Sequence, residues 1–387
     1  MGNKKKKGYT FRKFINDAHL WLGVGSSLVL FLVCLSGTIY TFRTEIEKMA
    51  EPKKFHIETV SGAKASYEAI IKSTQETAGG KVTRISYYDD PHQPYELQVS
   101  KSKEDKRGET YYVNPYNQMV LGTGKGPTSE FFMFFFKMHR WLLLDEKLGR
   151  PIVGAATLIF VLLTLTGLFL WFPKKIKGFK SLKPGFKIKW SANWKRINND
   201  LHNTLGFYTF LIILIMALTG LNWSFEWYKD GMGTVLGSKV FGGRDEKKIE
   251  SEAIANAKPL ALADFIRVGD SVFPYKGKTT IGMAKGPLGS VEFSKKNERN
   301  FNEDASDKVV LDQYTGAVLK KDVFSEKTTG AKIAAQIRAI HTGEIYGTFS
   351  KVVYFIVCLI ATSLPITGIF IWLNKMKKPK KKAVLQP

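Results

Sequence analysis

The sequence predicts a membrane protein in which a unit of helix, external α+β domain and helix occurs twice, giving four transmembrane helices. Three observations carry this prediction: four long apolar runs, basic strips that flank them, and an internal duplication. The chain has 387 residues, 44 % of them hydrophobic, and a formal net charge of +24. Repeats of this length decide the architecture before any local assignment is made.

Four apolar runs are long enough to cross a bilayer, which takes about 20 residues of helix. They occupy residues 20–42, 151–172, 205–225 and 351–373. The first run is longer than the apolar region of a signal peptide, and no A-x-A site follows it. We therefore expect it to remain as an uncleaved transmembrane anchor.

The positive charge lies in short strips beside these runs. Residues 1–16 hold six Lys and Arg, residues 173–199 hold nine and residues 375–387 hold six, with no Asp or Glu in any strip. The positive-inside rule places all three strips in the cytoplasm. We therefore expect a multi-pass protein of the bacterial inner (cytoplasmic) membrane, with both termini cytoplasmic and the long connections 45–135 and 228–340 periplasmic. Charge beside spans indicates membrane lipid as a partner and argues against nucleic acid.

The internal duplication is visible in all parts of the chain. At an offset of 183, the matching residues are Asn16, Asp17, His19, Leu22 and Gly23 against Asn199, Asp200, His202, Leu205 and Gly206. The second and fourth runs share "TGLFLWFPKK" and "TGIFIWLNKMKK". In the connections, "YVNPYNQMVLG" resembles "VLDQYTGAVLK", and both have the pattern of a β-hairpin. A helix-like segment and further strands precede each hairpin, which predicts one α+β domain per connection.

These observations divide the chain into nine segments. They are a basic cytoplasmic tail (1–18), span one (19–43), external domain one (44–130), an interfacial segment with span two (131–173), a basic cytoplasmic loop (174–198), span three (199–227), external domain two (228–337), an interfacial segment with span four (338–374) and a basic tail (375–387). Within residues 131–173, the Gly149-Arg150-Pro151 sequence is expected to separate the interfacial helix from span two.

Four of the six histidines stand at the heads of the four spans: His19, His139, His202 and His341. Ionisable residues in membrane segments indicate a functional site. Imidazole is a common axial ligand of haem, and two imidazoles on facing helices suit electron transfer. A zinc site would require more Asp, Glu or Cys at the same depth. The four residues are therefore predicted to ligate haem iron.

Depth predicts how the four histidines pair. His19 and His202 precede outward-running spans, whereas His139 and His341 precede inward-running spans. Because 18 residues of helix, from His19 to Gly37, cover roughly 27 Å, His19 and His139 are too far apart to share one group. We therefore expect two haems, one held by His19 with His202 and one by His139 with His341.

Further residues are expected to support these sites. Gly23 and Gly206 follow their histidines by one helical turn, which leaves room for a flat macrocycle. Arg140 and Arg338 lie beside the outer histidines, where they could meet a haem propionate or, alternatively, phospholipid headgroups. The Asn and Asp before each inner histidine could cap the helix or contact the imidazole.

These motifs resemble the PepSY-associated transmembrane family along the whole chain. The resemblance rests on the "DxHxxxG…TG" spans, the "HRW…GR…TGLFLW" second span, and "YVNPYN" and "LDQYTG", which are similar to PepSY modules. Among family members, ferric-siderophore reductases of the ferrioxamine type are the best match. The resemblance implies two PepSY-like periplasmic domains, b-type haem in a helical bundle, and reduction of a ferric siderophore or other Fe(III) chelate with release of Fe(II).

The electron donor and the alternatives stay open at this stage. No Gly-rich nucleotide fingerprint follows a strand, so the donor is expected to be a quinol or a separate cytoplasmic reductase. In the first alternative, the chain is a PepSY-domain membrane sensor, regulator or peptidase-inhibitor-like binding protein without redox activity. In the second, the histidines relay protons in a transporter, which the absence of Asp, Glu and Lys from mid-span disfavours.

Overall fold

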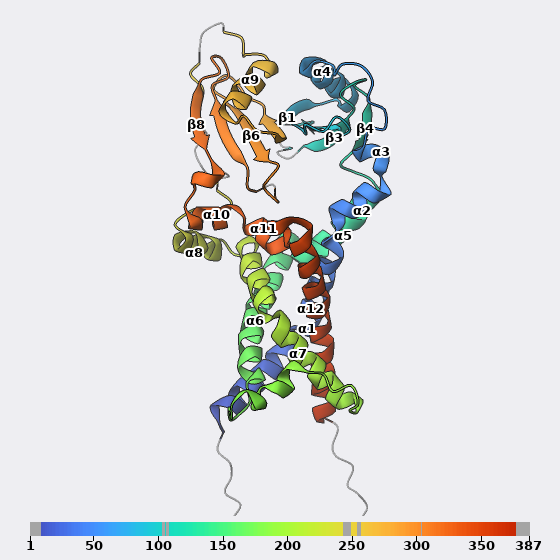
Figure 1. Ribbon diagram of the computed structural model, residues 1–387, viewed down its shortest axis with the longest axis vertical. Helices are drawn as coiled ribbons and strands as arrows, with labels where there is room; N and C mark the ends of the chain where they lie inside the picture. Colours follow the sequence, from blue (N-terminus) through green and yellow to red (C-terminus); the bar gives the residue numbers. More distant parts are fainter. Residues whose placement is uncertain are drawn as a thin grey trace, which may run out of the picture.

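The computed structural model describes residues 9–102, 105, 108–242, 249–253, 257–302 and 304–376. The outer parts of the two predicted cytoplasmic tails, residues 1–8 and 377–387, lie outside the described residues. A bundle of long helices carries a β-sheet domain at one end, and both ends of the described chain lie at the other (Figure 1). The molecule is therefore elongated along the axis of the bundle.

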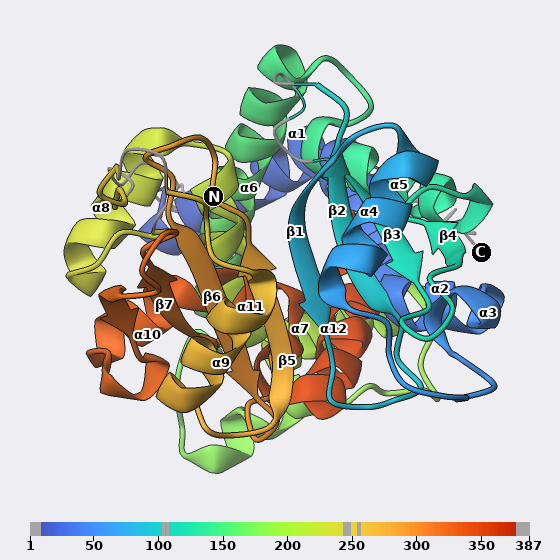
Figure 2. The same ribbon diagram turned by 90° about the horizontal axis from the view of Figure 1, so that it is seen from above.

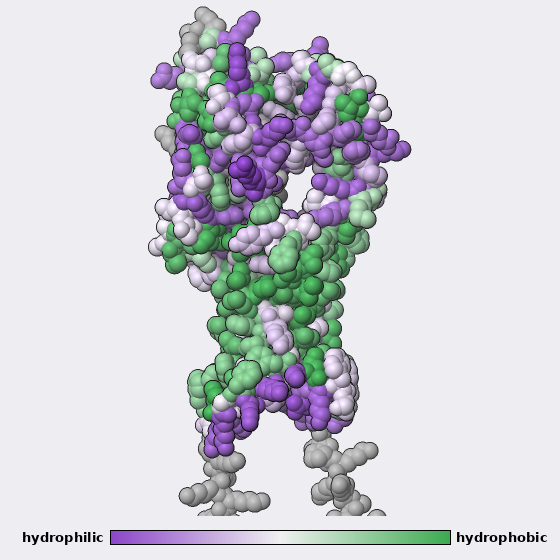
Figure 3. Space-filling view, viewed as in Figure 1, coloured by the Kyte–Doolittle hydropathy of each residue, from purple (hydrophilic) through white to green (hydrophobic). Residues whose placement is uncertain are grey.

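Four helices in the described part of the chain are long and apolar enough to cross a membrane. They are α1 (Phe11–Tyr40), α6 (Glu146–Trp171), α7 (Trp194–Gly220, extended by η3, Leu221–Trp223) and α12 (Gly347–Met376). Their outer surfaces form a hydrophobic band below the sheet domain (Figure 3). This band identifies the chain as a multi-pass membrane protein.

The bundle is a closed ring of four helices. α1 packs against α6 and α12, and α7 packs against the same two helices, so α1 and α7 occupy diagonal positions. Ile213, Val357 and Ala361 form the buried centre of the bundle, with Cys34 and Met216 beside them. This close packing at mid-height separates the two ends of the bundle.

Thr10 is the N-cap residue of helix α1, and its side chain accepts a hydrogen bond from the backbone N–H of Lys13. Asn193 is the N-cap residue of helix α7, and its side chain accepts from the backbone N–H of Arg196. The Asn-Asp pairs that precede the inner histidines lie inside these helices, so the expectation that they cap them is wrong. Other polar residues further upstream satisfy the free N–H groups of the first turns.

The interfacial helix α5 (Pro127–Trp141) is separate from α6, but the break is not at Gly149-Arg150-Pro151 as predicted. It lies at residues 142–145, where Leu142 and Leu143 adopt positive φ and Asp145 caps α6. Gly149 belongs to the first turns of α6, and a Cβ atom there would lie 2.0 Å from the carbonyl oxygen of Trp141. Its role is therefore to let α6 approach the end of α5.

The external domain is one continuous eight-stranded antiparallel sheet with the order β4-β3-β2-β1-β5-β6-β7-β8. The strands are β1 (Lys81–Tyr87), β2 (Tyr95–Ser100), β3 (Glu109–Val113), β4 (Val120–Thr123), β5 (Gly277–Gly282), β6 (Val291–Asn297), β7 (Asp307–Leu311) and β8 (Val318–Asp322). Helices α4 (Tyr67–Ala78) and α9 (Leu262–Val272) pack on it, one for each set of four strands (Figure 2).

The sequence predicts two α+β domains, and the structure joins them into this single sheet. The junction is the antiparallel pair β1–β5, in which Ile85 lies opposite Ile281 and both side chains are fully buried. Without this pair, each set of four strands would present an unpaired edge to solvent. Joining the two sets buries that edge and makes one core.

Short helices connect the sheet to the bundle. α2 (Arg43–Ala50) and α3 (Pro52–Phe55) lead from α1 into the first strands, and α5 leads back from β4. On the other side, α8 (Glu226–Leu236) follows α7, while η4 (Phe324–Glu326), α10 (Thr329–Ala335), α11 (Ile337–Thr342) and η5 (Glu344–Tyr346) lead from β8 to α12. α5 and α11 lie at the sheet end of the bundle (Figure 1).

Candidate functional site

The structure brings the four candidate histidines together as two pairs. His19 of α1 and His202 of α7, here the inner pair, lie at the bundle end away from the sheet, with ring centres 6.3 Å apart and ring planes at 87°. His139 of α5 and His341 of α11, here the outer pair, lie at the sheet end, with ring centres 6.2 Å apart and planes at 57°. These are the partners that the depth argument predicts.

The spacing of each pair fits ligation of one metal from opposite sides. A ligating imidazole nitrogen lies about 2.0 Å from the metal and the ring centre about 1.1 Å further away, so two opposite imidazoles have centres about 6 Å apart. Both pairs have this separation. A macrocycle that supplies its own equatorial ligands would need only these two nitrogens from the protein.

Hydrogen bonds at Nδ1 fix the tautomer of the inner pair. His19 Nδ1 lies 2.9 Å from Thr166 Oγ1, and His202 Nδ1 lies 2.9 Å from Thr367 Oγ1. Each threonine hydroxyl donates its hydrogen to a carbonyl of its own helix, so the oxygen accepts from the imidazole. Nδ1 therefore carries the proton, and Nε2 keeps a free lone pair for a metal.

The outer pair follows the same rule with carbonyl acceptors. His139 Nδ1 donates to the carbonyl of Val33 at 2.9 Å, and His341 Nδ1 donates to that of Met216 at 2.9 Å. Thr219 Oγ1 lies 3.1 Å from the same nitrogen of His341. Burial lowers the pKa of His341 to about 4 and also lowers the pKa of His139, so both imidazoles are neutral.

A glycine on a neighbouring helix faces each imidazole. A Cβ atom added at the glycine would lie 3.0–3.5 Å from the Cε1 atom of the ring, in the pairs Gly167–His19, Gly368–His202, Gly37–His139 and Gly220–His341. A Ser or Thr directly precedes each of these glycines. Each span therefore has one Ser/Thr-Gly dipeptide that packs against one imidazole. The repeated Ser/Thr-Gly dipeptide is visible in the sequence, where it aligns the spans, but the sequence alone does not indicate that it contacts the histidines.

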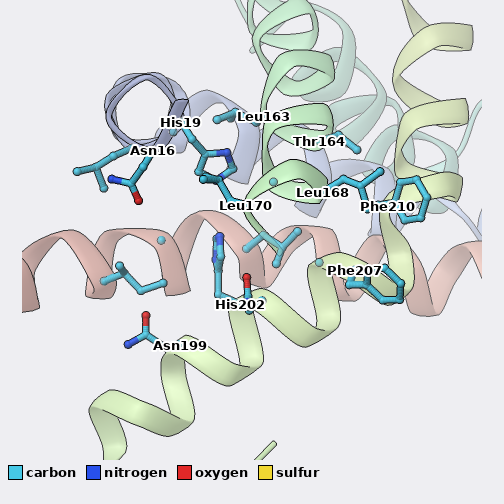
Figure 4. A pocket seen from close by; sticks show the side chains of 18 of the residues that line it. Asn16, His19, Leu163, Thr164, Leu168, Leu170, Asn199, His202, Phe207 and Phe210 are labelled. Atoms are coloured by element: carbon cyan, nitrogen blue, oxygen red, sulfur yellow. The ribbon is translucent and has the colours of Figure 1, made fainter. Parts of the chain in front are cut away.

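A cavity of about 1230 Å³ opens at the inner pair (Figure 4). His19 and His202 point into it from opposite walls, and Gly23 and Gly206 line it. A Cβ atom at either glycine would have its nearest neighbour, a leucine methyl, at 3.8–3.9 Å, so the expected space beside these glycines exists. The volume exceeds the roughly 300–1,000 Å³ of ordinary ligand pockets and is large enough for a macrocycle.

Four cations that are not among the site residues predicted from the sequence line the same cavity. They are Arg12, Lys13, Lys174 and Lys375, and no Asp or Glu is among the lining residues. Arg12 also donates to the carbonyls of Leu170 and Phe172 at the end of α6. Carboxylate groups of a ligand would find charge-assisted partners here.

The two predicted arginines are engaged within the protein. Arg338 forms ion pairs with Asp304 at 3.0 Å and Glu344 at 3.2 Å. The guanidinium of Arg140 lies over the rings of Phe136 and Trp141. Their expected contact with a propionate or with lipid headgroups stays a prediction.

The aspartates before the inner histidines do not contact the imidazoles. Asp17 accepts a hydrogen bond from the hydroxyl of Tyr9, and Asp200 pairs with Arg196 at 2.8 Å. The expectation that they orient the histidines is therefore wrong, because Thr166 and Thr367 already bond to both Nδ1 atoms. Asp200, which is buried, also accepts a hydrogen bond from the backbone N–H of Lys189.

The remaining histidines form a separate pair on the external domain. The rings of His56 and His92 lie 5.2 Å apart, and His92 Nδ1 donates to the carbonyl of Ile57. Within the described ranges, no three His, Cys, Asp or Glu side chains cluster in a way that would hold a bare metal ion. The donor sets that the described residues offer are thus pairs of imidazoles.

The fold and these pairs define a multi-pass membrane protein with a β-sheet domain at one end of its helical bundle and two histidine pairs. The chain belongs to the PepSY-associated transmembrane family, because the profile described as "PepSY-associated TM region" matches residues 17–375. The match includes all four histidines and both sets of strands. A comparison with curated proteins gives no match.

Proposed function

We propose that this protein is an inner-membrane b-type di-haem reductase that passes electrons across the membrane to an Fe(III) chelate, such as a ferric siderophore, and releases Fe(II). The single observation that carries the proposal is the two imidazole pairs, each at the spacing of opposite axial ligands. The free Nε2 atoms support it, because a metal binds the unprotonated nitrogen of an imidazole. The facing glycines support it because they let each imidazole lie close to the neighbouring helix that orients it.

The two pairs lie at opposite ends of the bundle. His19 and Gly37, which faces His139, are 18 residues apart in the continuous helix α1. His202 and Gly220, which faces His341, are also 18 residues apart in α7. Both intervals correspond to roughly 27 Å along the bundle. Two sites at this separation reach from one side of a bilayer core to the other.

The side chains of this protein hold and insulate the sites. Thr166 and Thr367 orient the inner imidazoles, and the carbonyls of Val33 and Met216 orient the outer ones. The apolar helices around them exclude water, which favours neutral imidazole as a ligand. Haem bound at each pair would supply one-electron Fe(III)/Fe(II) chemistry.

The orientation in the membrane and the duplication belong to the proposal. Basic strips flank the bundle end that carries the inner pair, so we place that end in the cytoplasm and the sheet domain in the periplasm. The two sets of four strands, each with its own helix, are then two copies of a PepSY-like domain. An Fe(III) chelate would accept one electron on the periplasmic side, and the Fe(II) formed binds hard oxygen donors more weakly.

The direct test is a reduced-minus-oxidised absorption spectrum of the protein purified from cells with ample haem. The expected result is a b-type spectrum with two haems per chain. Addition of a ferric chelate to the reduced protein should oxidise the haem and yield Fe(II), detected with a ferrous-specific chromogenic chelator. A colourless protein would contradict the proposal and favour the sensor or inhibitor-like alternative.

The pairing is tested separately with His202→Ala. This variant should lose the inner haem and keep the outer one, so the haem content should fall from about two to about one. His92→Ala, on the external domain, is the control and should retain both haems. A His202→Ala protein with unchanged haem content would show that the inner pair is not a ligand pair.

A further inference from the structure

Four cations, here called the ring, line the inner cavity at the end of the bundle away from the sheet. Arg12 and Lys13 come from the start of α1, Lys174 follows α6, and Lys375 lies near the end of α12. The side chains of Lys13, Lys174 and Lys375 belong to exposed residues, so they reach solvent as well as the cavity. Three of the four helices thus contribute positive charge around one opening.

The basic loop beside this opening has a defined structure. The carbonyl of Gly185 accepts hydrogen bonds from Trp171 Nε1 and Thr204 Oγ1, both at 3.1 Å. The Phe186 ring packs against Trp171 at 4.9 Å and against Phe207 at 5.3 Å. These contacts fix the loop to α6 and α7. The nine Lys and Arg of residues 173–199 are therefore displayed on a preformed surface, with no acidic residue among them.

The positive-inside rule accounts for basic residues on this side of the membrane, but not for their place around a cavity that holds two imidazoles. Haem b carries two propionates, which would neutralise two of the four lining cations. The ring would then keep a net positive charge, in addition to the charge of the loop. Such a surface attracts an acidic macromolecule over a distance of about 10 Å at moderate ionic strength.

We propose that this surface docks an acidic, soluble one-electron carrier, a reduced flavin or iron–sulfur protein, that delivers electrons to the inner site. The inference rests on the proposed function and its orientation. In this step the carrier would lose one electron, and haem iron held by His19 and His202 would gain it, with no bond broken and no proton transferred. The exposed lysines of the ring provide the contact, and the cavity beneath them brings the inner site close to the surface.

The cavity is less suited to the other donor class, a quinol. Oxidation of a quinol releases two protons, so its site needs a base close to the hydroxyl groups. The lining includes no carboxylate. Nδ1 of each imidazole in it bonds to a threonine, and Nε2 would be taken by the haem iron, so neither ring offers a free nitrogen to a quinol. A soluble carrier requires no proton acceptor, which favours it over a quinol.

The test measures binding of oxidised flavodoxin to the full-length protein in nanodiscs of zwitterionic lipid. We expect saturable binding that weakens as salt is raised, and no binding of the basic protein cytochrome c. The triple variant Lys13→Glu, Lys174→Glu, Lys375→Glu should weaken binding at least ~10-fold at low salt. The matched control, Lys72→Glu, Lys81→Glu, Lys308→Glu, reverses three exposed lysines of the sheet domain and should bind as the wild type does.

Neutral variants guard against a folding defect. Changing the same three lysines to Gln should give an intermediate loss of binding, compared between samples of equal haem content. Equal binding by the wild type and both ring variants would overturn the inference, as would reduction of the haem by a quinol but not by reduced flavodoxin. Either result would leave the proposed function intact if the haem spectrum is present. A protein without haem that still binds flavodoxin would refute the proposed function, and with it the electron delivery, and would leave only the docking surface.

Discussion

At the scale of single residues, the four imidazoles share one local arrangement. Each donates from Nδ1 to a hydroxyl or carbonyl oxygen on a neighbouring helix, and each lies against a glycine of that helix. The hydrogen bond sets the tautomer and the glycine sets how closely the ring approaches. Partners of this kind typically change metal affinity about 10–100-fold when they are removed. The long apolar helices therefore orient the four imidazoles.

The glycine contact gives a prediction for the outer pair. In Gly37→Val, the new side chain would begin 3.1 Å from His139 Cε1, too close for the ring to keep its place. We expect the variant to lose at least half of the outer haem while it retains the inner one, measured by haem content and by the reduced-minus-oxidised spectrum.

Gly25→Val is the matched control, because Gly25 lies on the same helix and a Cβ atom there meets nothing within 4 Å. It should bind haem as the wild type does. Loss of haem from both variants would point to a general defect of α1, and retention by both would contradict the role of Gly37.

The sequence predicts which histidines lie together, but it does not predict which residues form hydrogen bonds with them. Four histidines at matching places in four apolar runs identify the candidate ligands, and helix rise predicts which two share a depth. The partners Thr166 and Thr367 come from helices whose packing the sequence does not specify. The nearby aspartates are therefore the expected local partners, but they bond to Tyr9 and Arg196 and not to the imidazoles.

At the scale of elements, a chain of ion pairs joins the sheet domain to the sheet end of the bundle. Glu45 of α2 contacts Lys351 of α12 at 2.8 Å, Lys351 contacts Glu344 at 3.4 Å, and Glu344 contacts Arg338 of α11 at 3.2 Å. Arg338 also pairs with Asp304, which lies between β6 and β7. This chain of ion pairs ties α11, and with it His341, to α12 and to the β6–β7 connection.

The chain of ion pairs predicts the behaviour of Lys351→Met. The Lys351 side chain is 7 % exposed, so its removal leaves Glu45 and Glu344 close together without a counter-charge. Loss of one partner of a buried ion pair costs about 3–5 kcal/mol, and the partial exposure of both glutamates reduces this to about 1–3 kcal/mol. We expect a lower midpoint in thermal unfolding of the purified protein.

Two further variants make this result specific. Lys332→Met removes a half-buried lysine whose amino group donates to the backbone carbonyl of Ser325, and it should leave the midpoint unchanged. Lys351→Met with Glu45→Gln removes part of the uncompensated negative charge and should recover part of the loss. If the single and double variants had the same midpoint, repulsion between the glutamates would not be the cause of the lower midpoint.

The boundary between α5 and α6 is one that the sequence does not predict correctly. Gly149 and Pro151 are typical helix-breaking residues, but both fit the first turns of α6, where Pro151 disturbs few hydrogen bonds and Gly149 makes room for Trp141. The actual break uses Leu142 and Leu143 at positive φ, which composition does not signal. Tertiary packing decides this boundary.

At the scale of the whole molecule, the single sheet determines how the two halves of the chain relate. Strands from residues 81–123 and 277–322 meet at the β1–β5 pair, and each set is linked to the bundle by its own short helices. The hydrophobic patterns predict every strand set but not the pairing between sets, because both edges are alternating strands without a distinctive partner signal. The continuous sheet places one domain over the outer histidine pair.

The orientation of the whole molecule gives the last prediction. If the basic strips are cytoplasmic and the sheet domain is periplasmic, exposed positions in the two regions must lie on opposite sides of the membrane. Ser61 precedes α4 and Ser191 precedes α7, and both are exposed residues. A membrane-impermeant maleimide should label Ser61→Cys in intact spheroplasts and should label Ser191→Cys only after lysis. The native Cys34 and Cys358 lie within the bundle, so the wild-type protein is the background control. Labelling of Ser191→Cys in intact spheroplasts would reverse the orientation, and the inner pair would then face the periplasm instead of the cytoplasm.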